Sequence, residues 1–196
     1  MLRIGLTGSI GAGKSTVARI FETLSIPVFY ADQETKRLYE SNADLRALLI
    51  KGFGEQVYSH GKLDRLYLSQ KVFGDETLLR QLNSIVHPFA IIAAEKWMKE
   101  QQSPYIIKEA ALIFESGSGA SLDYVIGVTA PHHLRIHRAM QRDHLTREQV
   151  LSRESKQISD SIKMKLCDFV IVNNEQRFLT TQVLDLHHHL LALERK

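Results

Sequence analysis

The chain has 196 residues, of which 44% are apolar and 24% are charged, a composition typical of a globular protein with a buried core. Its single cysteine, Cys167, excludes an internal disulfide bond. No apolar run reaches the roughly 18 residues that a membrane-spanning helix needs. The start of the chain does not resemble a secretory signal. We therefore expect a cytoplasmic protein that binds no membrane.

The net charge of +3 is concentrated in one segment, from Arg135 to Lys165. This segment has eight basic and four acidic residues, or +4, which leaves seventeen basic and eighteen acidic residues, or −1, elsewhere. Such an excess attracts phosphate, nucleic acid or an anionic surface, or forms a solvated helical face. The segment lacks the interleaved aromatic residues typical of nucleic-acid binding, so we expect no nucleic-acid partner.

Five short, nearly unbroken apolar runs alternate with longer helical patterns. This alternation is typical of an α/β protein in which helices cover a parallel sheet whose strands are buried on both faces. The predicted strands are Leu2–Thr7, Ile26–Tyr30, Tyr105 to Phe114, Tyr124–Thr129 and Phe169–Asn173.

Two insertions interrupt this alternation. The first, residues 33–103, contains several helical patterns broken by glycines, and it is a natural place for substrate contacts. These patterns are Thr35–Tyr39, Leu45–Leu49, Leu66–Val72, Thr77–Val86 and Phe89–Glu100. The second insertion, 138–165, lies in the basic segment. The core then comprises 1–32, 104–137 and 166–196, and it closes with a helix from about Arg177 to Glu194.

One motif predicts the chemistry of the chain. The sequence from Gly8 to Ser15 fits G-x-x-x-x-G-K-[ST] at every fixed position, and it lies between the first strand and a helix that begins near Lys14. Backbone N–H groups in such a loop bind phosphate oxygens. In this motif the lysine contacts the β- and γ-phosphates and the hydroxyl binds Mg²⁺. We therefore predict an ATP–Mg²⁺ site. Its residues are Gly8, Gly11, Ala12, Gly13, Lys14, Ser15 and Thr16.

A phosphate loop alone does not separate a kinase from a GTPase switch or a motor ATPase. The guanine-reading pattern N-K-x-D and the switch pattern D-x-x-G are both missing from the sequence. The alternatives left open are a small-molecule kinase acting on an alcohol or nucleotide, an adaptor that holds ATP without turnover, and a nucleic-acid-binding protein. A kinase needs an orienting carboxylate and a lid that carries arginines, and the chain offers candidates for both.

Three acidic residues are candidates for the carboxylate. Asp32 follows the second predicted strand, at the sheet edge where ligands bind, or it caps the next helix. Glu109 lies in an apolar run and needs a partner or a metal. Glu115 follows the same run, either as the first exposed residue or as a functional one. Arg138 and Arg142 lie four residues apart on one helical face, a spacing that suits a clamp for phosphate oxygens.

The motifs together resemble the dephospho-CoA kinase family, nearly from end to end. The matching blocks are GLTGSIGAGKST, where the family typically reads GLTGGIGSGKST, then FYADQETKR, LNSIVHP, EAALIFESG, RAMQRD and CDFVIVN. The resemblance implies a P-loop kinase fold with a five-stranded parallel sheet, a helical substrate domain and a lid. It implies ATP-dependent phosphorylation of the ribose 3′-hydroxyl of 3′-dephospho-CoA, with a monomer or weak homo-oligomer as the working unit.

The resemblance also assigns roles to single residues. Asp32 matches the position of the family's catalytic aspartate. Lys14, Arg138 and Arg142 are the other catalytic residues that the resemblance implies. Asn173 joins the ATP site, and Glu109 stands as a second possible ligand of Mg²⁺ beside Ser15. Substrate contacts are implied for Asp32, Lys36, His87, Glu109, Leu112 and Glu115.

Overall fold

The computed structural model describes residues 1–194. The chain forms two compact units: the first comprises Met1–Phe29 and the residues from Gln101 onward, and the second comprises Tyr30–Glu100. The predicted insertion 33–103 overlaps the second unit, whereas the predicted lid, 138–165, falls within the first. Each unit has its own set of buried residues and is described separately below.

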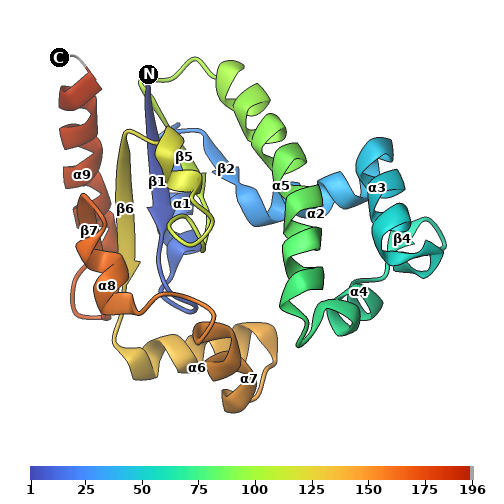
Figure 1. The fold of residues 1–196 in the computed structure, drawn as a ribbon. Helices are drawn as coiled ribbons and strands as arrows, with labels where there is room; N and C mark the ends of the chain where they lie inside the picture. The colour runs from blue at the N-terminus through green and yellow to red at the C-terminus, as the bar shows by residue number, and fades with distance from the viewer. Residues whose placement is uncertain (195–196) are drawn as a thin grey trace. The chain divides into compact units, whose positions relative to one another are not determined.

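A five-stranded parallel sheet is the centre of the fold, as predicted (Figure 1). Its strands follow the order β2-β5-β1-β6-β7, which places the first strand in the middle. Side chains of the central strands are almost completely buried, which explains their unbroken apolar sequences. The strands are β1 (Leu2–Thr7), β2 (Val28–Tyr30), β5 (Tyr105–Glu109), β6 (Tyr124–Thr129) and β7 (Phe169–Val172).

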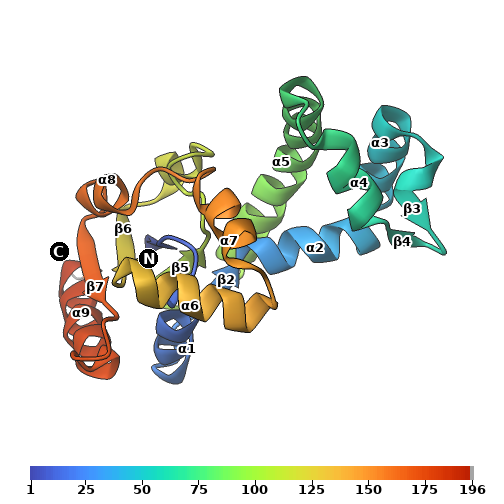
Figure 2. The ribbon, with the colours of Figure 1, turned by 90° about the horizontal axis from the view of Figure 1, so that it is seen from below.

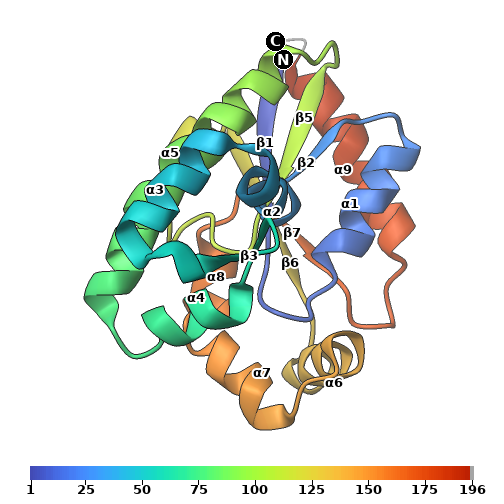
Figure 3. The ribbon, with the colours of Figure 1, turned by 90° about the vertical axis from the view of Figure 1, so that its right-hand side faces the viewer.

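Helices cover both faces of this sheet. Helices α1 (Lys14–Thr23) and α9 (Leu179–Glu194) contact each other and β5, and they lie on one side of the sheet in Figure 3. Helix α8 (Asp160–Lys165) packs on β6. Gly127 of β6 leaves room for that helix, because a Cβ atom there would lie only 2.7 Å from the sulfur of Met164. The N-terminal ammonium lies 3.4 Å from the Glu194 carboxylate, which ties the start of the chain to α9.

Two helices fill the basic segment before α8. Figure 2 shows α6 (His132–Asp143) and α7 (Arg147–Glu154) side by side. Thr146 begins α7 with a capping box, in which its hydroxyl accepts from the backbone of Gln149 and the Gln149 side chain accepts from the backbone of Thr146. Between the two helices, buried Arg135 of α6 donates a hydrogen bond of 2.6 Å to Glu154 of α7. These contacts hold the two helices together as one layer.

Strand β7 is one of the two edge strands of the sheet, and a side chain from α9 occupies part of its edge. The Gln182 amide accepts from the backbone N–H of Val172 at 2.9 Å and donates to the carbonyl of the same residue at 3.0 Å. One glutamine thus makes both hydrogen bonds that a neighbouring strand would make with Val172.

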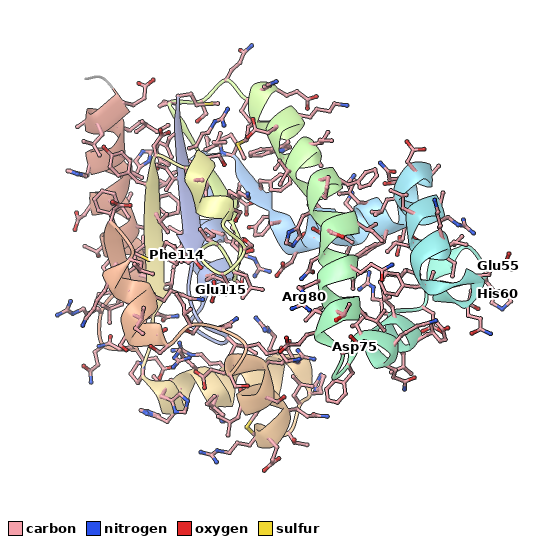
Figure 4. The ribbon with its side chains drawn as sticks, in the orientation of Figure 1. Glu55, His60, Asp75, Arg80, Phe114 and Glu115 are labelled. Atoms are coloured by element: carbon pink, nitrogen blue, oxygen red, sulfur yellow. The ribbon has the colours of Figure 1, made fainter. Side chains whose placement is uncertain are left out.

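The second unit is helical and has a core of its own. Its helices are α2 (Ala31–Ser41), α3 (Ala43–Phe53), α4 (Arg65–Val72) and α5 (Glu76–Lys99), and a short 3₁₀ turn, Glu55–Val57, leads into a hairpin of β3 (Tyr58–Ser59) and β4 (Lys62–Leu63). Asn42, Asp64 and Asp75 each accept a backbone hydrogen bond at the start of a helix. Figure 4 labels Asp75, which precedes α5. The buried core residues are Leu45, Leu49, Phe53, Val57, Leu68 and Val86.

Two predicted elements had wrong boundaries, and one hairpin was missed. The third strand ends at Glu109 rather than Phe114, and the residues after it form turns. The patterns Thr77–Val86 and Phe89–Glu100 form one helix that continues through Pro88. Buried Val86 before the proline and buried Ala94 after it show that packing outweighs the lost backbone hydrogen bond. The hairpin of β3 and β4 was not predicted. Among the described residues, no helix has both the length and the apolar character that a membrane span requires.

Candidate functional site

The loop between β1 and α1 has the conformation that phosphate binding requires. Gly11 and Gly13 have φ angles of 74° and 98°, in the left-handed region that glycine adopts without strain. A methyl group at Gly11 would lie 2.0 Å from the carbonyl oxygen of Arg135 on α6. A methyl group at Gly13 would lie 2.2 Å from the side-chain nitrogen of Asn173. Both the left-handed backbone conformation and the close neighbouring atoms therefore require glycine at these positions.

The N-terminus of α1 opens at this loop. Gly13 is the N-cap, no side chain caps the helix, and its first turn contains no acidic residue. The N–H groups of Thr16 and Val17 donate to the Gly13 carbonyl. The Lys14 ammonium spans the loop and donates to the carbonyl of Gly8 at 3.0 Å. Exposed Ser15 and Thr16 follow. Aligned amides, a positive helix end and an ammonium group form a site for phosphate oxygens.

Asn173, a predicted ATP-site residue, lies against the phosphate loop. Its side-chain amide donates to the carbonyl of Ala12 at 2.9 Å, and its backbone N–H donates to Thr129 at the end of β6 at 2.8 Å. Its own carbonyl accepts from Arg138 at 3.2 Å. The structure therefore brings Ala12, Gly13, Asn173 and Arg138 together.

The two predicted clamp arginines lie on α6, and each contacts an acidic residue. Arg138 donates to Glu175 at 2.8 Å, and Arg142 makes two hydrogen bonds to Asp143 at 2.8 and 2.9 Å. Hydrogen bonding to Asp143 raises the pKa of Arg142 although burial opposes it, and the negative charge of Glu109 adds to the rise. Glu109, 9% exposed at the end of β5, is thus within electrostatic range of Arg142.

Glu115 lies in the loop that follows β5, next to Phe114 (Figure 4). Its carboxylate accepts from the fully buried Lys163 ammonium at 3.0 Å and from the backbone N–H of Ile158 at 3.1 Å. Burial raises the pKa of Glu115, but the hydrogen bonds outweigh burial and the pKa is lowered. One oxygen of this carboxylate, Oε1, thus joins the loop to the end of the basic segment, and the substrate contact expected at Glu115 stays a prediction. Leu112, in the same loop, is 44% exposed.

Three further predicted residues belong to the second unit: Asp32, Lys36 and His87, all exposed. Asp32 follows strand β2, which ends at Tyr30. The alternative that Asp32 is the N-cap was wrong, because Tyr30 is the N-cap of α2. Asp32 lies in the first turn of α2, where a carboxylate is favoured by the helix dipole. Lys36, four residues later, lies on the same side of that helix.

Sequence reasoning missed one carboxylate that contacts the phosphate loop. Asp160, the first residue of α8, accepts hydrogen bonds of 2.6 Å from Ser9 and from Thr129. Gln157, just before it, accepts from the backbone N–H of Ile10 at 3.2 Å. The sequence shows Asp160 only as one acid in a basic segment. No local pattern relates it to a loop about 150 positions earlier in the chain.

The oxygen atoms near the loop are of the kind that Mg²⁺ prefers. Ser15 provides a hydroxyl at the start of α1, and Glu109 provides a carboxylate on the strand beside β1, in register with Leu6. The described residues contain no cluster of three or more His, Cys, Asp or Glu suited to a metal ion. Magnesium is commonly held by one or two protein oxygens together with phosphates and water, so Ser15 and Glu109 fit such an ion.

Comparisons with known proteins point to one family. A family model described as dephospho-CoA kinase matches residues 2–178. A dephospho-CoA kinase of Bacteroides fragilis (strain YCH46) is 36% identical over 186 residues, which cover 94% of this chain and 91% of that protein.

Solved structures agree with it as well. The crystal structure of TT1252 from Thermus thermophilus superposes with a TM-score of 0.85 at 31% identity, covering 96% of each chain. Dephospho-CoA kinase from Campylobacter jejuni superposes with a TM-score of 0.70 at 27% identity, covering 97% of each chain. The chain belongs to the dephospho-CoA kinase family.

Proposed function

We propose that this chain transfers the γ-phosphate of ATP to the ribose 3′-hydroxyl of 3′-dephospho-CoA, giving coenzyme A and ADP. The observation that carries the proposal is an intact phosphate loop in a chain that matches the dephospho-CoA kinase model over residues 2–178. An adaptor without turnover would not need Lys14, Ser15 and Asp32 together, and all three are present.

On the donor side, the N–H groups of the loop and the start of α1 bind the phosphates, and Lys14 neutralises charge on the β- and γ-phosphates. Asn173, held against Ala12, shapes the neighbouring wall of the site. Arg142, an exposed residue of α6, is supported as a phosphate contact because it lies within electrostatic range of Glu109 at the end of β5. Arg138 is supported by its hydrogen bond to the Asn173 carbonyl. Both arginines stabilise charge on the transferring group.

On the acceptor side, Asp32 orients or deprotonates the 3′-hydroxyl. Lys36 and His87, which also belong to the second unit, contact the acceptor, as does Leu112 from the loop after β5. Residues 33–103 then act as the substrate domain and 138–165 as the lid. Glu115 contacts the acceptor as well, and its hydrogen bonds to Ile158 and Lys163 position the loop that carries Leu112.

Ser15, with Glu109 as a second ligand, would hold Mg²⁺ beside the phosphates. When bound, this ion neutralises charge on the β- and γ-phosphate oxygens. We further propose that the protein works in the cytoplasm as a monomer or weak homo-oligomer, with no nucleic-acid or membrane partner. Its single cysteine, whose pKa is raised to about 11 by burial and which donates to the Lys163 carbonyl, suits a reducing compartment.

The test is a comparison of acceptors. Purified protein with ATP and Mg²⁺ is given 3′-dephospho-CoA, AMP, CMP or shikimate, and ADP release is measured for each. We expect kcat/KM to be highest for 3′-dephospho-CoA, with phosphorus NMR placing the new phosphate on the 3′-hydroxyl. Lys14→Met is the control for phosphate-loop turnover. A preference for AMP, CMP or shikimate would instead identify another small-molecule P-loop kinase.

A further inference from the structure

Asp160 joins two parts of the chain that the family motifs treat separately. One carboxylate oxygen accepts from the Ser9 hydroxyl of the phosphate loop, and the other accepts from the Thr129 hydroxyl at the end of β6, both at 2.6 Å. Hydroxyl–carboxylate hydrogen bonds of this length are among the stronger ones in proteins. Ser9 is only 1% exposed, so its hydroxyl has little access to water as an alternative partner. We call these three residues the Asp160 clasp.

A second set of contacts holds the next residue of the loop. The Ile10 backbone donates to the Gln157 side chain at 3.2 Å. The Ile10 side chain is buried in an apolar cluster with Ile136 and Ala139 of α6 and Val150 of α7. The first two variable positions of the phosphate loop are thus held by the predicted lid and by the residues that end it.

We propose that Asp160 is a positioning residue that sets the shape of the phosphate loop through Ser9 and Thr129. The inference rests on the proposed function, in which that loop binds ATP. Ser9 stands where the family motif typically has glycine, so the hydrogen bond from its side chain to Asp160 is a feature of this chain. The clasp fixes the loop before nucleotide binds, and it makes nucleotide affinity depend on α8.

The clasp makes a specific kinetic prediction. Loop amides contact the phosphates in the ground state and in the transition state alike, so a looser loop weakens ATP binding with little effect on the chemical step. We expect Ser9→Ala to raise the Kd and the KM for ATP about tenfold, or about 1.4 kcal/mol. We expect kcat and the KM for the acceptor to stay within about twofold. Ser116→Ala, in the loop after β5, is the matched control and should change none of them.

A double-mutant cycle separates the clasp from general loss of structure. Ser9→Ala, Asp160→Asn and the double variant are compared by calorimetric titration with ATP and by thermal unfolding. Once Asp160 is changed, removing the Ser9 hydroxyl as well should weaken ATP binding little further, so the double variant should resemble Asp160→Asn. Thr129→Ser retains the hydroxyl and should keep ATP affinity, whereas Thr129→Val loses the hydroxyl and should lower it.

The outcomes are distinguishable. Variants that unfold at lower temperature with unchanged Kd for ATP would show that the clasp is only structural, and the proposal would be wrong. Additive effects of Ser9→Ala and Asp160→Asn on the Kd would likewise overturn it. Wild-type protein that binds ATP but does not phosphorylate dephospho-CoA would overturn the proposed function alone, because the titration needs no acceptor.

Discussion

The ammonium of Lys163 lies 3.0 Å from the carboxylate of Glu115, and the lysine side chain is completely buried. The same lysine donates to the carbonyl of Ala111 at 3.0 Å, and Thr7 at the end of β1 donates to that carbonyl at 3.3 Å. One charged pair therefore holds together the loop after β5, helix α8 and the strand that leads into the phosphate loop.

Removing one member of this pair should strongly destabilise the fold, because the other charge is left buried without a partner. We expect Lys163→Met to lower the free energy of unfolding by about 3–5 kcal/mol. The double variant Lys163→Met/Glu115→Gln should recover part of that loss. Urea unfolding measures the stability of the single and the double variant. The control is Lys165→Met, because Lys165 is an exposed residue of the same helix. A single variant as stable as wild type would show that the pair contributes nothing.

The pair also gives the stability a pH dependence. The pKa of Glu115 is lowered in the folded state, since its hydrogen bonds outweigh the rise caused by burial. A carboxyl with a lowered folded pKa stabilises above its unfolded value of about 4.3, and the benefit is lost as pH falls through the folded value. The stability difference between wild type and Glu115→Gln should therefore shrink from pH 5 to about pH 3. A constant difference in urea unfolding at each pH would contradict this.

Gly11→Ala should abolish nucleotide binding or folding, for two reasons. The new methyl group meets the Arg135 carbonyl at 2.0 Å, and φ is 74°. Gly117→Ala separates the two effects, because φ there is 68° and nothing lies within 4 Å of the new methyl. The control should lose only about 1 kcal/mol. Thermal unfolding and ATP titration of both variants test this, and equal losses in the two would mean that the close contact does not matter.

Asp32→Asn should keep the Kd for ATP near wild type and lower kcat by about 10²-fold or more, because the amide cannot accept a proton from the 3′-hydroxyl. Asp44→Asn is the control, since Asp44 is an exposed aspartate in the first turn of α3, the counterpart of Asp32 in α2. Steady-state kinetics with both substrates provide the measurement. Near-normal turnover in Asp32→Asn would remove this residue from the mechanism.

Arg142→Lys should lower kcat by more than about 10-fold, because a lysine cannot reproduce the planar fork of the guanidinium. Arg153→Lys is a close control, since Arg153 also lies beside Asp143, at 3.7 Å, and is 57% exposed. If the two variants lose the same activity, the effect belongs to the Asp143 pairing and not to a phosphate contact.

The sequence predicted the parts of the site whose signals are local. The loop motif, the helix that starts at Lys14 and the strands Leu2–Thr7 and Tyr124–Thr129 all agree with the structure. In each, the side chains that make the pattern are neighbours in the chain. The role of Asp32 stays a prediction, and its local structure was not predicted, because an apolar run ending in Ala31-Asp32 does not reveal that helix α2 begins at Ala31.

The contacts that were missed join distant positions. Asp160 contacts Ser9 across 151 positions, and Lys163 contacts Ala111 across 52. Contacts between such distant positions produce no periodic pattern in the sequence. Helix α5 was divided at Pro88 because a proline removes one backbone donor, yet tertiary packing keeps the helix continuous. Glu115 was read as exposed or functional because the lysine that neutralises it lies in another segment.

The glutamine on α9 that pairs with Val172 has a consequence for how molecules of this protein behave together. Edge strands with unpaired backbone groups recruit strands from other chains, and this recruitment is a common route to aggregation. Here the side-chain amide of Gln182 already fills both positions at Val172. A strand from another molecule would first have to displace the Gln182 side chain from Val172. This contact therefore opposes the addition of a sixth strand at β7.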